Sequence, residues 1–323
     1  MDRHNSIINL ELASYGYKSD SPPLVSVVIP TFNRAYCLDR AIRSVMDQTY
    51  QNWELIIVDN HSTDSTDDLV ESYSDSRIRM VKIQNSGIIA MSRNKGLREA
   101  LGKFIAFLDS DDWWVPCKLE ESIKALQMGV EITYHKLYLV TSKTWKPTFW
   151  NVSKSRNLHS PIFNDLLMHG HAINTSSVVV SRDMLNKIQG FSENPSLIGI
   201  EDYDAWLRLS KITESFKNLN KTLGYYWDGG GNVSSAENTI RNLESLSDVH
   251  QNIETGQRYF DISPGYAFAM GRSKLELKKF HEAEAYFRVV LIRAPRFSML
   301  IRSLIFMCTC RLKKYFHQNF RSN

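Results

Sequence analysis

The amino-acid sequence predicts an α/β fold with a mostly parallel sheet and flanking helices, followed by a C-terminal α-helical region. Two observations support this prediction. Between residues 25 and 108, short β-rich runs alternate with stretches in which apolar residues recur at helical spacing, which is typical of a parallel sheet with helical crossovers. From residue 236 onward the pattern is helical. At 323 residues and 43% hydrophobic content, the chain can bury a substantial core.

The four β-rich runs are each followed by small polar or acidic residues. The runs cover residues 25–29, 53–58, 78–83 and 104–108, and helical stretches cover 35–47, 65–73 and 88–101. The polar endings are Pro30-Thr31-Phe32-Asn33, Asp59-Asn60-His61-Ser62-Thr63-Asp64, Gln84-Asn85-Ser86-Gly87 and Asp109-Ser110-Asp111-Asp112. Because the carboxyl ends of parallel strands form the ligand crevice of open α/β sheets, the four endings are expected to converge on one site.

The acid cluster Asp109-Ser110-Asp111-Asp112 directly follows the apolar run 104–108. Three carboxylates this close repel one another unless a cation or a donor group neutralises them, and oxygen ligands suit Mg²⁺ or Mn²⁺. A divalent metal that holds a diphosphate is the predicted partner. Taken alone, the cluster would be interpreted as a turn and N-cap before a helix that opens near Pro116, but the polar endings of the preceding strands favour a ligand site.

Charge is unevenly distributed along the chain. Residues 271–323 contain twelve lysines and arginines and only three glutamates, whereas the whole chain has a formal net charge of +4. A basic tail suggests an anionic surface, and a membrane is expected rather than nucleic acid, because nothing in the body resembles a nucleic-acid reader. The four cysteines lack metal-ligand spacing, and residues 1–23 form a polar extension without a signal-like apolar stretch. A cytoplasmic location is expected.

Five segments, in this order, resemble family 2 glycosyltransferases. They are Pro30-Thr31-Phe32-Asn33-Arg34, Val58 to Asp64, Asn85-Ser86-Gly87 with Ser92-Arg93-Asn94, Phe107 to Trp114, and Glu201-Asp202-Tyr203-Asp204-Ala205-Trp206. The resemblance implies a Rossmann-like GT-A catalytic domain over residues 24–235. It also implies an inverting, nucleotide-sugar-dependent transfer with Mn²⁺ or Mg²⁺ as cofactor.

The same resemblance assigns roles to individual residues. Asp59 would accept a hydrogen bond from the nucleotide base, which suits uracil and a UDP-sugar, and Asp111 with Asp109 would hold the metal. Asp202 would be the base that deprotonates the acceptor hydroxyl, with Glu201 in support. Without the resemblance, Glu201 and Asp202 would be interpreted as acids favoured in a first helical turn. The full set expected to bind the nucleotide-sugar is Pro30, Thr31, Asn33, Asp59, Asn85, Gly87, Arg93, Asp109 and Ser110.

Some features depart from the family pattern. Many relatives carry a histidine near the start of the glycine-rich stretch 229–231, where this chain has Trp227 and Asp228, so the later metal ligands stay open. The three glycines suit a lid that closes on the donor. The Gln-x-x-Arg-Trp signature of processive synthases is absent, which favours transfer of one sugar per encounter. Asp112 is expected to support its neighbours, and at least one of Trp113 and Trp114 is expected in the core.

The helical C-terminal region covers residues 236–323. Residues 264–295 look like a single tetratricopeptide-type hairpin, which must pack on the catalytic domain, a partner or the following helix, although a plain helical bundle fits equally well. Residues 296–320 are expected to form a basic amphipathic helix, too short and too charged to span a bilayer. This helix would either lie on an anionic membrane surface or cap the hairpin.

These features predict a peripheral-membrane enzyme at the inner face of the plasma membrane. It would move one sugar from a UDP-sugar to a hydroxyl of a polyprenyl-diphosphate-linked glycan in bacterial surface-polysaccharide synthesis. A catalytically silent nucleotide-sugar-binding scaffold on the same fold is one alternative, but it would not need both the acid cluster and the pair Glu201-Asp202. A nucleotidyltransferase should carry a glycine-rich basic loop after the first strand, and Pro30 to Arg34 is not such a loop.

Overall fold

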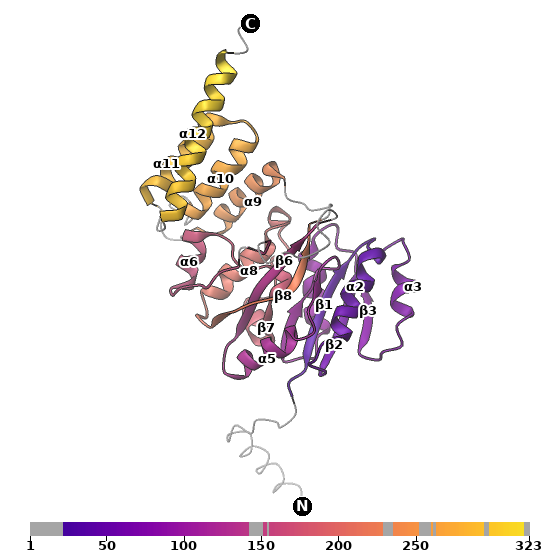
Figure 1. Ribbon diagram of the computed structural model, residues 1–323. Helices are drawn as coiled ribbons and strands as arrows, with labels where there is room; N and C mark the ends of the chain where they lie inside the picture. Colours follow the sequence, from indigo (N-terminus) through magenta and orange to yellow (C-terminus); the bar gives the residue numbers. More distant parts are fainter. Residues whose placement is uncertain are drawn as a thin grey trace, which may run out of the picture.

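One mixed sheet of eight strands organises the sheet region, residues 22–228 (Figure 1). The computed structural model describes residues 22–141, 151–153, 155–228, 235–251, 260, 263–293 and 297–319. The strand order is β3-β2-β1-β4-β7-β6-β8-β5. The strands are β1 (Val25–Thr31), β2 (Trp53–Asp59), β3 (Ile78–Lys82), β4 (Phe104–Phe107), β5 (Trp113–Trp114), β6 (Ile132–Val140), β7 (Val179–Ser181) and β8 (Phe216–Trp227).

The predicted alternation of strands and helices is confirmed. Strands β1 to β4 are parallel, with β1 between β2 and β4, and β3 beside β2. Strand β7 then pairs antiparallel with both β4 and β6, which makes the sheet mixed. The helices of the sheet region are α2 (Ala35–Met46), α3 (Thr66–Glu71), α4 (Ile89–Glu99), α5 (Lys118–Gln127), α6 (Ile162–His169), α7 (Arg182–Lys187) and α8 (Glu201–Ser210), with short 3₁₀ turns η1 (Thr175–Ser177) and η2 (Pro195–Leu197).

Both faces of strand β1 are covered, which explains its nearly continuous apolar sequence. Val27 and Ile29 lie in one hydrophobic cluster, and Val28 lies in a second cluster on the opposite face. Helix α4 packs closely on this second face, because a Cβ placed on Gly96 would lie 2.3 Å from Cγ1 of Val28. The close contact fixes the position of α4, the helix that carries Arg93.

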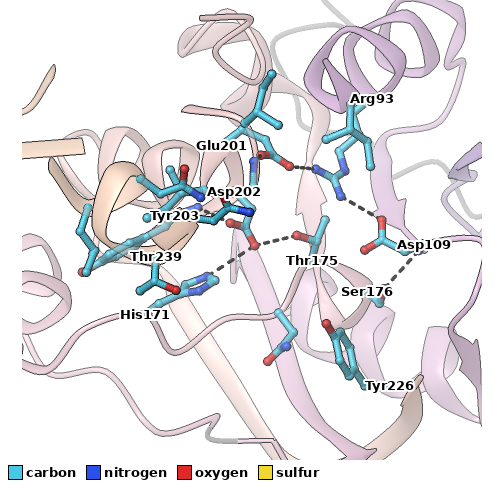
Figure 2. Close-up of a pocket in the computed structure, with 18 of the residues that line it drawn as sticks. Arg93, Asp109, His171, Thr175, Ser176, Glu201, Asp202, Tyr203, Tyr226 and Thr239 are labelled. Atoms are coloured by element: carbon cyan, nitrogen blue, oxygen red, sulfur yellow. Dashed lines mark hydrogen bonds and ion pairs between the residues drawn. The ribbon is translucent and has the colours of Figure 1, made fainter. Parts of the chain in front are cut away.

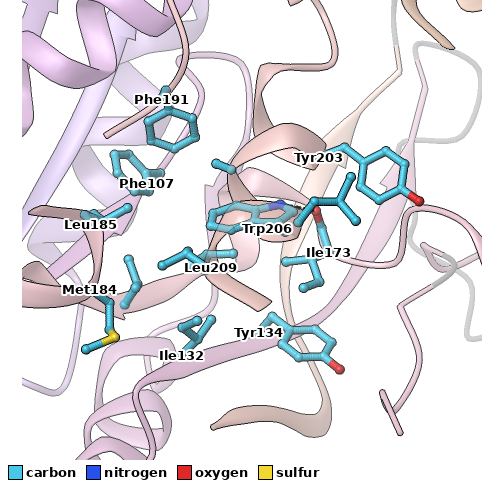
Figure 3. Close-up of a cluster of buried hydrophobic side chains, with 14 of the residues drawn as sticks. Phe107, Ile132, Tyr134, Ile173, Met184, Leu185, Phe191, Tyr203, Trp206 and Leu209 are labelled. Carbon is cyan, nitrogen blue, oxygen red and sulfur yellow. Dashed lines mark hydrogen bonds between the residues drawn. The ribbon is translucent and has the colours of Figure 1, made fainter. Parts of the chain in front are cut away.

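Helix α8 is anchored in the sheet region by Trp206, which is fully buried. Its ring lies 6.0 Å from that of Phe191, which in turn meets Phe107 edge to face at 5.0 Å (Figure 3). The indole Nε1 donates a hydrogen bond of 3.2 Å to the Ile173 carbonyl. Truncating a buried tryptophan typically costs about 3–5 kcal/mol, so this anchor holds α8 firmly in place.

The helical region, residues 235–319, packs directly on the sheet region rather than standing apart from it. Figure 1 shows its helices beyond α6 and α8, at the end of the molecule far from β3. At the end of α9, His250 Nε2 lies 2.9 Å from Asp204 Oδ1 of α8, and both side chains are buried. A Cβ on Gly265 would lie 2.7 Å from the backbone nitrogen of Gly170. The helices are α9 (Ala236–Val249), α10 (Pro264–Glu276), α11 (Phe280–Arg293) and α12 (Phe297–Asn319).

Helices α10 and α11 form the expected pair within residues 264–295, and α12 packs on them. A Cβ on Gly271 would lie 2.8 Å from the Phe287 ring, and the Phe287 and Phe306 rings stack at 5.5 Å. The hairpin therefore contacts both the sheet region and the following helix. Within the described segments, no helix has the length and apolar content needed to cross a membrane. Residues 1–21 of the predicted extension, the predicted lid glycines 229–231, and residues 294–296 and 320–323 lie outside the described residues.

Candidate active site

A cavity of about 610 Å³ lies between the carboxyl end of β4, the start of α8 and the helical region (Figure 2). Its lining includes seven of the predicted site residues: Gly87, Arg93, Asp109, Ser110, Asp111, Glu201 and Asp202. Five others, namely Pro30, Thr31, Asn33, Asp59 and Asn85, do not line it. The expected convergence of four strand ends on one crevice is therefore correct only in part, because the ends of β1 and β2 lie outside this cavity.

The acid cluster is not a helix cap. Strand β5 follows it directly, and α5 begins only at Lys118, so the capping interpretation is wrong. Burial, and next the charge of Asp109, raise the pKa of Asp111. Burial and the charges of its two acidic neighbours hold the pKa of Asp112 well above its usual value. The cluster therefore favours positive charge beside it.

Two arginines already bind Asp111. Arg34 Nη1 lies 2.6 Å from Asp111 Oδ2, and Arg40 Nη2 donates to the Asp111 carbonyl at 2.8 Å. Asp112 accepts a hydrogen bond of 2.9 Å from the backbone nitrogen of Trp227 and so joins the acid cluster to the end of β8. Its supporting role stays a prediction.

Arg93 is the buried centre of the site, with a side chain only 3% exposed. Its Nη1 lies 2.6 Å from Glu201 Oε1, and its Nη2 lies 2.9 Å from Asp109 Oδ1. Burial on its own would lower the pKa of Arg93, but the neighbouring carboxylates, Asp109 first, raise it above its usual value. Arg93 therefore stays charged and links α4, the end of β4 and the start of α8.

Asp202 occupies the first turn of α8 and is held from three directions. Its Oδ2 accepts a hydrogen bond of 2.9 Å from Thr175 Oγ1 and lies 3.5 Å from His171 Nε2. Its Oδ1 accepts a hydrogen bond of 2.7 Å from the Tyr203 backbone nitrogen. The side chain is 18% exposed, so its carboxylate is oriented by the protein while remaining accessible. Figure 2 shows it between Arg93 and His171.

The residues predicted to bind the nucleotide base form a separate group at the ends of β1 and β2. The Asp59 carboxylate is fully buried, lies 2.9 Å from Lys82 Nζ, and accepts a hydrogen bond of 3.0 Å from the Ser62 backbone nitrogen. Asn33 adopts a left-handed conformation (φ 50°), and its Oδ1 accepts a hydrogen bond of 2.7 Å from the Thr63 backbone nitrogen. Both side chains therefore fix the turn at Ser62-Thr63. Contact with a base stays a prediction.

The turn before α4 is built by Asn85. Its Oδ1 accepts a hydrogen bond of 2.9 Å from the Gly87 backbone nitrogen, and its Nδ2 donates to Ser92 Oγ at 2.8 Å. Gly87 has φ of 81° and open space where a Cβ would stand, a conformation that favours glycine. Gly87 lines the cavity, whereas Asn85 and Ser92 do not. Thr31, at the end of β1, is buried.

Comparison with known proteins decides the family. The family model described as Glycosyl transferase family 2 matches residues 26–188. The chain belongs to glycosyl transferase family 2. Two Escherichia coli relatives, WfgD and WfaP, are both described as UDP-Glc:alpha-D-GlcNAc-diphosphoundecaprenol beta-1,3-glucosyltransferase. WfgD is 33% identical over 189 residues, covering 58% of this chain and 70% of WfgD. WfaP is 30% identical over 231 residues, covering 71% of this chain and 86% of WfaP.

A solved structure confirms the predicted GT-A-type fold of this family 2 glycosyltransferase. S. aureus TarS 1–349, crystallised in complex with UDP-GlcNAc, superposes with a TM-score of 0.57 and 17% sequence identity. The match covers 91% of this chain and 92% of the TarS chain. At this level of identity the likeness establishes the fold alone.

The acidic residues of this family 2 glycosyltransferase suit a metal that is shared with a ligand. Across the described part of the chain, no three His, Cys, Asp or Glu side chains are grouped as a metal site. Mg²⁺ and ions like it commonly take one or two protein carboxylates and complete their shell with substrate phosphates and water. The cavity carboxylates Asp109 and Asp111 fit such an ion bound together with a diphosphate.

Several residues of the site were not predicted from the sequence. Arg34 belongs to the segment Pro30 to Arg34, but its pairing with Asp111 was not expected. Tyr226, at the end of β8, lines the cavity, as do His171 and Thr175, which carry no periodic or motif signal. Trp114 is buried, with its indole donating 2.7 Å to the Ser176 carbonyl, so it is the core tryptophan that was expected.

Proposed function

We propose that this protein is an inverting glycosyltransferase of bacterial surface-polysaccharide synthesis. It moves one sugar from a UDP-sugar to a hydroxyl of a glycan linked to polyprenyl diphosphate. The names of WfgD and WfaP support UDP-glucose as donor and GlcNAc-diphosphoundecaprenol as the type of acceptor. The β-1,3 linkage in those names supports inversion, because glucose is α-linked in UDP-glucose. The observation that carries the proposal is the cavity in which the acid cluster and Asp202 meet around the buried Arg93.

Asp202 is the proposed general base. As the acceptor oxygen attacks the anomeric carbon, Asp202 takes the hydroxyl proton, and the bond from that carbon to the diphosphate oxygen breaks. UDP leaves with the electron pair of the broken bond. The contacts of Asp202 with Thr175 and Tyr203 orient its carboxylate, while Glu201, bound to Arg93, holds the start of α8 in place.

Asp111 and Asp109 are the proposed protein ligands of Mn²⁺ or Mg²⁺. When bound, such an ion offsets the negative charge that develops on the leaving diphosphate. Arg34 occupies the Asp111 carboxylate at 2.6 Å, so an ion at Asp111 competes with this arginine. The groups at Asn33, Asp59 and Asn85 are the proposed base and ribose side of the donor site.

The test is product analysis with the full-length protein. UDP-glucose, Mn²⁺ and a synthetic lipid carrying an α-GlcNAc diphosphate should give UDP only when this acceptor is present. Asp202→Asn should slow the reaction by about 10²- to 10⁴-fold, whereas Asp183→Asn, at an exposed position on α7, should leave its rate unchanged. In a separate reaction with UTP and glucose 1-phosphate, release of pyrophosphate would establish nucleotidyl transfer instead. Tight UDP binding without any product would establish a scaffold.

We also propose that helix α12 holds the enzyme on an anionic membrane surface. One face of α12 packs on the hairpin, where Phe306 contacts Phe268 and Phe287. The opposite face carries a stripe of exposed apolar residues: Phe297, Ile301, Leu304, Ile305 and Leu312. Successive members are four, three, one and seven residues apart, a spacing that places all of them on one side of a helix.

Basic residues lie along one border of this stripe on α12. Arg302 and Lys313 stand between the stripe and the face that carries Phe306, and both are exposed. Basic residues beside an apolar face are a feature of helices that lie in an anionic bilayer interface. A location at the inner face of the plasma membrane would bring the cavity to a lipid-linked acceptor. The capping contact of α12 is thus observed, and its other face is the proposed lipid contact.

Vesicle flotation tests this contact. The protein should float with phosphatidylglycerol vesicles and not with phosphatidylcholine vesicles, and Ile305→Glu should reduce flotation at least tenfold. Met128→Glu is the matched control, because it introduces the same charge at an exposed apolar residue that lies at the end of α5 and outside α12. This variant should float like the wild type. If the wild type does not float but forms a concentration-dependent dimer, and Ile305→Glu abolishes this dimer, then a second copy covers the stripe instead.

A further inference from the structure

The helical region completes the cavity. Eight of the lining residues come from α9, α10 and the segment between them: Asn238, Thr239, Asn242, Leu243, Phe260, Gly265, Tyr266 and Ala269. We call this set the helical wall. In Figure 2, Thr239 of the wall and His171 lie on one side of Asp202, whereas Arg93 and Asp109 lie on the other side. Asp202 therefore stands between the acid cluster and the helical wall.

The helical wall is held in a fixed position relative to Asp202. Gly265 at the start of α10 lies so close to Gly170 that a Cβ would meet its backbone nitrogen at 2.7 Å, and Gly170 directly precedes His171. At the other end, His250 at the end of α9 binds Asp204, two residues after Asp202 on α8, at 2.9 Å. Two buried contacts thus align the wall with both the base and the histidine beside it.

The chemistry of the wall suits a sugar. Asn238 and Asn242 contribute amide groups, and Tyr266 contributes an aromatic ring beside them. The Thr239 hydroxyl donates to the Ser235 carbonyl at 2.9 Å, which leaves its oxygen to accept a hydrogen bond from a sugar hydroxyl. Asn242 is only 7% exposed, and its Oδ1 has no hydrogen-bond partner within the described residues. A buried acceptor atom without a partner is costly, so a ligand hydroxyl that donates to it would be favoured.

The wall carries no charge of its own. Its eight side chains include neither acids nor bases, whereas the opposite side of the cavity holds Asp109, Asp111 and two arginines. A diphosphate and its metal belong on the charged side. The uncharged side fits a neutral sugar ring, and Asp202 stands between it and the charged side.

We propose that the helical wall is the subsite for the terminal sugar of the acceptor, with Thr239 and Asn242 as specificity-determining residues. This inference rests on the proposed function, because it assigns the acceptor side of that same site. The C-terminal helices are then part of the active site, and they couple acceptor choice to a region outside the segment 26–188 that the family model matches.

Steady-state kinetics with UDP-glucose and the synthetic α-GlcNAc diphosphate lipid test the subsite. Thr239→Val and Asn242→Leu should each raise the acceptor KM about tenfold, which corresponds to about 1.4 kcal/mol for one lost hydrogen bond. UDP affinity, measured by thermal shift, should stay at the wild-type value. Arg241→Gln, at an exposed position on α9 outside the lining, should leave the acceptor KM unchanged.

The outcomes separate the two claims. If the wild type transfers sugar and both variants retain the wild-type acceptor KM, the helical wall is not the acceptor subsite while the proposed function stands. If the wild type binds UDP but transfers no sugar to this acceptor, the proposed function fails and the subsite with it. Because Thr239 is partly exposed, Thr239→Val retains the fold even if the buried change at Asn242 does not.

Discussion

Replacing Arg93 with methionine removes a buried cation that joins two acidic residues of the site. The guanidinium lies 2.6 Å from Glu201 Oε1 and 2.9 Å from Asp109 Oδ1, and the arginine side chain is 3% exposed. Methionine keeps most of the apolar length of the side chain but leaves both carboxylates without this partner. The perturbation therefore tests whether electrostatics at Arg93 stabilises the fold around the cavity.

The expected cost follows from burial. Removing one partner of a buried ion pair typically costs about 3–5 kcal/mol. Glu201 is 7% exposed and would lose most, although the Gly199 backbone nitrogen still donates to it at 2.7 Å. The Asp109 side chain is 30% exposed, so water compensates part of its loss. Arg93→Met should therefore lower the free energy of unfolding by about 3 kcal/mol, the lower end of that range.

Urea unfolding followed by circular dichroism measures this loss. Lys95→Met on the same helix is the matched control, because Lys95 pairs with Glu99 at 2.6 Å on the surface, and such pairs contribute about 0.5 kcal/mol or less. Combining Arg93→Met with Glu201→Gln should cost less than the sum of the two single changes, by about 1–3 kcal/mol. Equal losses for Arg93→Met and Lys95→Met, or strictly additive losses in the double variant, would show that the Arg93 ion pairs do not stabilise the fold.

Three further predictions concern other parts of the molecule. Burial, and next the charge of Lys118, lower the pKa of His135 to about 3. Between pH 7.5 and 5.5 the imidazole therefore gains a proton only in the unfolded chain, whose histidine pKa is about 6.5, and the free energy of unfolding should fall by about 1.4 kcal/mol. In urea titrations at the two pH values, His135→Gln should lack this part of the pH dependence. Arg34→Gln removes the arginine that lies 2.6 Å from the Asp111 carboxylate. Because the lost ion pair competes with the metal and is worth about 1 kcal/mol, Mn²⁺ should bind about threefold to tenfold more tightly in calorimetry without nucleotide. Weaker Mn²⁺ binding by the variant would contradict this expectation. Gly265→Val places carbon against the Gly170 backbone and should cost about 1–3 kcal/mol in urea unfolding, whereas an unchanged midpoint would show that this contact is not tight.

The sheet was predictable where the signal is local. Strands β1 to β4 and their crossover helices follow from apolar periodicity, and the element bounds differ from the predictions by no more than two residues. Strand β7 was not predicted, because a strand of only three residues, Val179–Ser181, takes its place from antiparallel pairing with β4 and β6 rather than from its own sequence.

The site was predictable where polar residues directly follow strands or stand in a family motif. Arg93 was assigned to the donor site, but composition alone would leave an arginine in solvent. Its burial depends on partners 16 and 108 residues away in the chain, Asp109 and Glu201. His171 and Thr175 lie in a connecting segment without periodicity, and only the folded chain brings them to Asp202.

The turnover of Asp202→Asn with UDP-glucose and the synthetic acceptor tests whether Asp202 is the base. The variant keeps the size of the side chain and its contact with Thr175, but it cannot accept the hydroxyl proton. We expect a loss of about 10²- to 10⁴-fold in kcat with unchanged UDP binding. Wild-type turnover by Asp202→Asn, with a loss in Glu201→Gln instead, would contradict the assignment of Asp202 as the base.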